Sequence, residues 1–69
     1  MMPTLGQINT LNQLLLDLYA SNIPPQTITF SRRGDKPFVT LIAEPRHDLK
    51  EARWYYIEND GRFYKVYGK

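Results

Sequence analysis

Apolar side chains in the first part of the chain recur at intervals of three and four positions, which is the period of an α-helix. The repeat consists of Ile8, Leu11, Leu15 and Leu18, and it is widened by Leu14 and Tyr19. The intervening positions are mainly polar, as at Asn9, Asn12, Gln13 and Asp17. The pattern predicts a helix that packs one face against the rest of the chain.

Both ends of this helix carry recognisable signals. Thr4 and Gln7 have the spacing of a capping box, in which the two side chains satisfy free N–H groups at the start of a helix. Thr10 and Gln13 repeat this spacing, so the sequence offers a second possible start for the helix. At the other end, Asn22 tolerates a left-handed conformation, and the two prolines that follow cannot continue a helix. We therefore expect the helix over residues 5–21.

After the prolines the pattern changes to the two-residue period of β-strands. The predicted strands cover residues 26–32, 37–44, 52–58 and 62–67. The second strand is apolar on both faces, which is typical of a central strand. Glycine-containing turns separate the strands of each pair, and a polar connection over residues 46–51, long enough for one helical turn, joins the two pairs.

One helix followed by two hairpins predicts a single α+β domain over residues 1–69. An isolated hairpin is marginal in water, so we expect the two hairpins to form one four-stranded antiparallel sheet with the helix packed across one face. A curled, SH3-like small barrel with an N-terminal helix is the alternative.

The turn at residues 59–61 allows two registers for the last hairpin. A two-residue loop, Asp60-Gly61, places Tyr64 and Val66 on the face of Ile57. A three-residue loop instead places Tyr64 and Val66 on the face of Trp54 and Tyr56, because a shift of one residue exchanges the faces of a strand. In either register one helix covers only one face, so the other face is left aromatic.

An aromatic surface that the chain does not cover is typical of an interface. The candidate protein-interface residues are Trp54, Tyr56, Phe63, Lys65 and Tyr67. We expect a small non-enzymatic binding or regulatory protein that acts through an aromatic sheet face or edge on a protein partner or on a second copy of itself. From its size alone, it fits an accessory or inhibitor protein of a phage or another mobile element.

The charge pattern supports an alternative function, nucleic-acid binding. The 69-residue chain has a formal net charge of +2, and its nine Lys and Arg residues all follow residue 24. The tip of the first hairpin is basic, and with aromatic strands behind it such a tip suits single-stranded nucleic acid. The candidate nucleic-acid residues are Arg32, Arg33, Lys36 and Arg62.

The sequence offers little for catalysis, metals or cofactors. It has no cysteine and a single histidine, His47, so neither a metal-ligand cluster nor a catalytic triad has the residues it needs. No glycine-rich phosphate loop is present. We therefore expect no enzymatic activity and no cofactor. The absence of cysteine and of a signal peptide favours a cytoplasmic protein, and no apolar run approaches the ~18 residues of a membrane span.

Residues 54–64 combine a Trp-Tyr-Tyr run with an Asp-Gly turn. This segment resembles the hairpins of choline-binding cell-wall repeats. Those repeats occur in tandem arrays, whereas this chain contains one copy, so the resemblance implies shared hairpin chemistry only.

Overall fold

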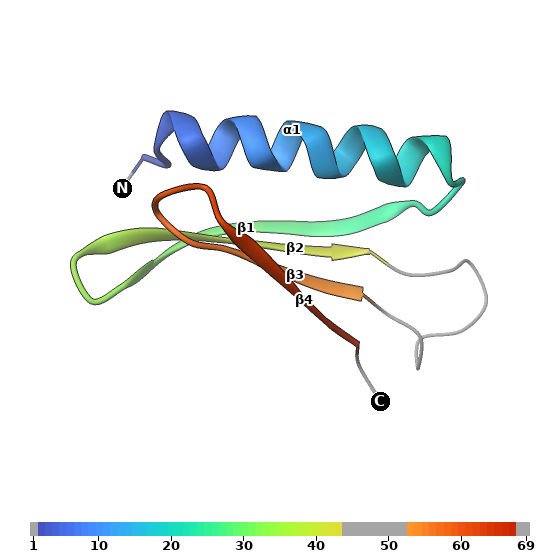
Figure 1. Cartoon of the computed structure of the whole chain (residues 1–69). Helices are drawn as coiled ribbons and strands as arrows, with labels where there is room; N and C mark the ends of the chain where they lie inside the picture. The colour runs from blue at the N-terminus through green and yellow to red at the C-terminus, as the bar shows by residue number, and fades with distance from the viewer. Residues whose placement is uncertain (1, 44–52, 68–69) are drawn as a thin grey trace.

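The computed structural model describes residues 2–43 and 53–67 (Figure 1). Helix α1, Leu5–Ala20, begins with the expected capping box: the Gln7 backbone N–H donates to the Thr4 hydroxyl, and the Thr4 N–H donates to Gln7 Oε1. The helix ends where Asn22 adopts a φ of +58°. The Ile23 N–H then bonds back to the carbonyl of Leu18, as in a Schellman-type end.

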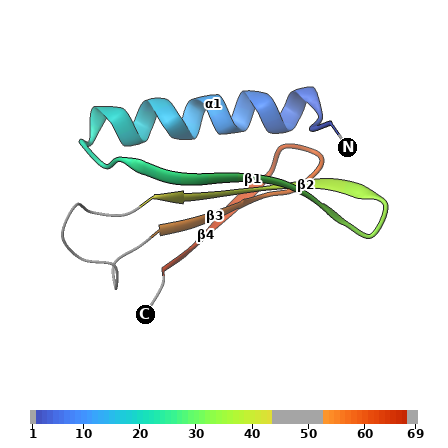
Figure 2. The same cartoon turned by 180° about the vertical axis from the view of Figure 1, so that it is seen from behind.

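Four strands follow in the order β1-β2-β3-β4, each antiparallel to its neighbour (Figure 2). Their bounds are Pro25–Arg33, Lys36–Ala43, Arg53–Ile57 and Phe63–Tyr67. The sheet is open, and α1 lies across one face of it, which confirms the predicted α+β fold in place of the SH3-like barrel. The polar connection over residues 46–51 lies outside the described residues.

The core lies between α1 and the two central strands. Leu14 and Leu18 of the helix are buried against strand residues that all point to the same side of the sheet. These strand residues are Val39, Leu41 and Ala43 of β2 and Tyr55 and Ile57 of β3. The helix therefore seals the middle of one face and leaves the outer strands β1 and β4 at its flanks. No helix among residues 2–43 and 53–67 is long and apolar enough to cross a membrane.

The start of α1 is joined to the β3–β4 turn by hydrogen bonds. The Thr4 hydroxyl donates to the carbonyl of Asn59 over 2.7 Å, and the Thr10 hydroxyl donates to the carbonyl of Gly61 over 2.6 Å. Gln7, which is fully buried, donates from Nε2 to the carbonyls of Pro37 at 2.8 Å and Ile57 at 3.4 Å. These bonds hold the helix start over the ends of β2 and β3.

The last hairpin has the three-residue loop. Ile57 pairs with Phe63 and Tyr56 with Tyr64, so the loop comprises residues 59–61. The Glu58 N–H donates to the carbonyl of Arg62, and the Gly61 N–H donates to the carbonyl of Glu58. Gly61 has a φ of +92°, which a residue with a side chain rarely adopts. Of the two registers that the sequence allows, the structure thus selects the one that groups Tyr64 with Trp54 and Tyr56.

Candidate functional site

The face of the sheet turned away from α1 carries a group of aromatic side chains that spans three strands. Side chains alternate along each strand, so the neighbours of the buried core residues point to this side. We call it the far face. Its residues on β2, β3 and β4 are Phe38, Thr40, Ile42, Trp54, Tyr56, Tyr64 and Val66. Hydroxyl side chains of β1 border it, namely Thr27, Thr29 and Ser31. Within the described part of the chain, no other element packs on this face (Figures 1 and 2).

Four rings of the far face pack against one another as a single aromatic cluster. Tyr56 lies at its centre, with its ring centroid 5.8 Å from that of Phe38, 6.5 Å from that of Trp54 and 5.2 Å from that of Tyr64. All three pairs are stacked, with interplanar angles of 18° to 28°. The cluster therefore spans β2, β3 and β4, and its rings are already ordered against each other.

Arg33, at the end of β1, closes the cluster on one side. Its guanidinium carbon lies 3.9 Å from the centroid of the Phe38 ring, and its Nη1 donates to Glu58 Oε2 over 3.0 Å. A hydrogen bond with the Tyr64 side chain, followed by the charge of Glu58, raises the pKa of Arg33. The charge of the guanidinium is therefore balanced by a carboxylate on the same face.

The aromatic cluster is partly accessible. Phe38 is buried among its neighbours, Trp54 and Tyr56 are half-buried, and Tyr64 is 44% exposed. Val66, next along the same face of β4, is 46% exposed. The accessible surface therefore broadens from β2 toward β4.

The structure places four of the five candidate protein-interface residues in two groups. Trp54 and Tyr56 lie on the far face, side by side in the cluster. Phe63 and Lys65 lie on the helix side of β4, where the Phe63 ring contacts Tyr55. Tyr67 ends β4 opposite Arg53.

Sequence reasoning did not include Phe38, Tyr64 and Val66 among the candidates. The three-residue register already grouped Tyr64 and Val66 with Trp54, so choosing that register would have found them. Phe38 carries no such signal, because its place in the cluster depends on how β2 pairs with β3.

The four candidate nucleic-acid residues do not form one basic patch. Arg33 is paired with Glu58, and Arg62 is paired with Asp60 through a contact of 2.8 Å between Nε and Oδ2. Arg32 alternates with Arg33 along β1 and so points to the other side of the sheet. Lys36 is exposed beside the turn, opposite Arg33.

The described residues contain no group of three His, Cys, Asp or Glu side chains that could hold a metal ion. His47 lies outside them. Comparisons with protein-family models, with curated proteins and with solved structures find no match to this chain.

Proposed function

We propose that this protein is a non-enzymatic binding protein that docks a protein partner on its far face. The observation that supports the proposal is the aromatic cluster of Phe38, Trp54, Tyr56 and Tyr64, which no described element covers. Tyr and Trp are the residues on which the affinity of protein interfaces most often depends. Because the rings are already stacked, they would lose little side-chain entropy when a partner contacts them.

The composition of the far face suits a protein better than a nucleic acid. An apolar centre with a border of hydroxyl groups, here those of Thr27, Thr29 and Ser31, has the layout of a protein interface. Nucleic acid requires cations that are available to phosphates. Arg33, the guanidinium nearest to the cluster, is instead bonded to Glu58.

The test compares two aromatic residues of β4 that lie next to each other and point to opposite faces. Tyr64 is 44% exposed on the far face, and Phe63 is 50% exposed on the helix side. Immobilised wild-type protein and the variants Tyr64→Thr and Phe63→Thr are each incubated with a nuclease-treated lysate of the source organism. A partner retained by the wild type is then purified and titrated.

We expect the partner to bind wild type and Phe63→Thr alike, and Tyr64→Thr at least ten times more weakly, because an interface aromatic commonly contributes about 2 kcal/mol. Trp54 is the only tryptophan, so its emission should shift to the blue as the partner covers the cluster. Equal binding of Tyr64→Thr, or an unchanged Trp54 emission, would contradict the proposal.

Nucleic-acid binding, the alternative function, has its own measurement. A mobility shift with single-stranded oligonucleotides at low salt, abolished by Lys36→Ala together with Arg32→Ala, would favour it. We expect no shift, because two of the four candidate cations are paired with carboxylates.

A further inference from the structure

Strand β1 is a long sheet edge that is open on one side. It pairs with β2 only, and every residue from Gln26 to Arg33 is exposed. The turn after it has two residues, Gly34 and Asp35, so Arg33 and Lys36 exchange hydrogen bonds and the ladder alternates from there. It follows that Ile28 and Phe30 direct their backbone N–H and C=O groups away from β2, toward the open side.

The two edges of the sheet differ in how they resist pairing with another chain. Natural sheets blunt an edge by keeping it short, by placing charges, above all lysine, on it, and by prolines and bulges. Strand β4 has the first two features, with five residues and Lys65 in its centre. Strand β1 has nine residues, and from Pro25 to Ser31 none is charged. Its proline and its one register irregularity lie at the start of the strand, between Pro25 and Thr27, so the ladder from Thr27 to Arg33 is regular. Of the two edges, β1 is therefore the one suited to accept another strand.

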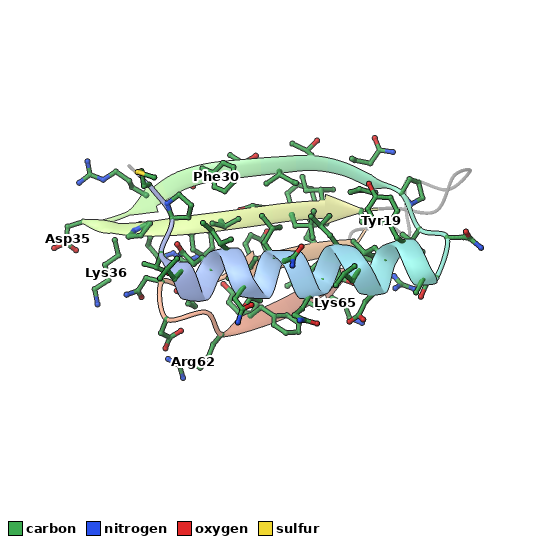
Figure 3. All side chains as sticks on the ribbon, turned by 90° about the horizontal axis from the view of Figure 1, so that it is seen from above. Tyr19, Phe30, Asp35, Lys36, Arg62 and Lys65 are labelled. Carbon is green, nitrogen blue, oxygen red and sulfur yellow. The ribbon has the colours of Figure 1, made fainter. Side chains whose placement is uncertain are left out.

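Apolar side chains accompany this open edge on the helix side of the sheet. Ile28 is 39% and Phe30 is 54% exposed. Figure 3 shows Tyr19 on the side of α1 that faces β1, whereas Lys65 lies on the opposite side. Ile8 lies about three turns before Tyr19 and so shares its side of the helix. We call Ile8, Tyr19, Ile28 and Phe30 the β1 flank.

The sequence of β1 is complementary to itself in the antiparallel direction. If two copies are related by a two-fold axis through Thr29, Ile28 lies opposite the partner's Phe30, and both direct their backbone groups outward. Thr27 lies opposite Ser31 in the same register. Aromatic residues opposite β-branched ones, and hydroxyl residues opposite each other, are favourable cross-strand pairs.

Charge does not oppose this pairing. Arg32 would lie opposite Gln26, and the two Arg32 residues would be about 20 Å apart, since a strand rises about 3.4 Å per residue. That separation is more than twice the Debye length of about 8 Å at physiological salt, so their repulsion is screened.

We propose that a second copy of this chain pairs with the β1 edge, antiparallel and centred on Thr29, to form a dimer with one continuous eight-stranded sheet. Such an interface is isologous, because the same strand serves both copies. Both helices lie on the same side of the joint sheet, where the β1 flanks of the two copies meet across the axis. The two aromatic clusters lie on the other side, so the dimer is independent of partner binding to the far face.

The first test uses the two edges as each other's control. Ile28→Lys with Phe30→Lys places like charges opposite each other across the axis. Tyr64→Lys with Val66→Lys adds the same charge on β4, at side chains of similar exposure. Mass is measured by light scattering after size exclusion, and circular dichroism verifies folding of each variant.

We expect twice the chain mass for the wild type and for the β4 variant, and the mass of a single chain for the β1 variant. A wild type that stays monomeric up to the highest concentration reached would overturn the proposal. So would a dimer that survives the β1 change.

The second test examines the register and does not depend on lysine. The chain has no cysteine, so Thr29→Cys introduces a single thiol. At a non-hydrogen-bonded pair the two Cα atoms lie about 4.5 Å apart, which permits a disulfide. In Thr27→Cys the two thiols are four residues out of register, about 14 Å apart. Mild oxidation should therefore crosslink Thr29→Cys at least ten times faster, and equal rates would overturn the register.

Discussion

Gln7 shows how one polar side chain connects three elements. Its amide is fully buried, yet each of its polar atoms has a partner: Oε1 accepts from the Thr4 N–H, and Nε2 donates to the carbonyls of Pro37 and Ile57. No buried polar side-chain atom of the described residues lacks a hydrogen bond. Gln7 thus acts as a capping residue and as a link from the helix start to the ends of β2 and β3.

Gln7→Leu should therefore be strongly destabilising even though leucine is similar in size and favours helices. The substitution leaves the Pro37 carbonyl and the Thr4 N–H without their partners, which costs about 1–3 kcal/mol. Gln13→Leu, on an exposed turn of the same helix, should change stability by less than about 0.5 kcal/mol. Urea denaturation measures the stability of both variants. Equal effects would show that the hydrogen bonds of the Gln7 side chain contribute nothing to stability.

At the scale of elements, the β3–β4 turn is organised by Asp60. Its carboxylate accepts from the backbone N–H of Arg62 at 3.0 Å and from the Arg62 side chain at 2.8 Å. The backbone bond, followed by the side-chain bond and charge of Arg62, lowers the pKa of Asp60 below its usual value. The ionised carboxylate therefore favours the folded turn.

The sign of the resulting pH dependence follows from the lowered pKa. Ionised Asp60 stabilises the folded state at pH values above the pKa of an unfolded aspartate, about 3.9, and this contribution is lost as the pH falls through the lower folded-state pKa. Asp60→Asn should therefore flatten the fall in unfolding free energy below pH 4, as measured by urea denaturation at a series of pH values. Asp35→Asn changes the net charge equally on the other turn and serves as the control. A profile of Asp60→Asn that matches the wild type would contradict this assignment.

At the scale of the whole molecule, two glycines allow the helix to dock on the last hairpin. A Cβ built on Gly61 would lie 3.0 Å from the Gly6 carbonyl oxygen, and one built on Gly6 would lie 3.2 Å from the Asp60 carbonyl oxygen. The helix backbone and the turn backbone thus meet without an intervening side chain. This close approach, together with the bonds of Thr4 and Thr10, positions β4 and so determines which of its side chains face away from α1.

Gly61→Ala and Gly34→Ala separate backbone conformation from this close approach. Both glycines have positive φ, so an alanine at either position costs about 1–2 kcal/mol. A Cβ at Gly34 meets nothing within 4 Å, whereas a Cβ at Gly61 presses on the helix. We expect the larger loss of thermal stability for Gly61→Ala, with a difference of at least several degrees in Tm. Equal losses would show that the helix can move away from the added methyl group at no cost in free energy.

The sequence by itself determined the secondary structure and the fold class of this protein, because both depend on local interactions. The capping box at Thr4, the end of the helix near Asn22, and the alternation of the strands depend on neighbours within a few residues, so the helix, the four strands and the open α+β fold were predictable. The uncovered aromatic face followed from the same patterns, because one helix covers one face of a sheet.

Tertiary contacts decided which residues lie on that face. Loops of two and three residues both suit the sequence at 59–61, and a change from one to the other exchanges the sides of the sheet on which Tyr64 and Phe63 lie. The contact between Gly6 and Gly61 joins residues far apart in the chain, as do the bonds of Thr4 and Thr10. No local pattern encodes such a contact, and for that reason the residues that make up the far face were decided only once the helix was docked on the sheet.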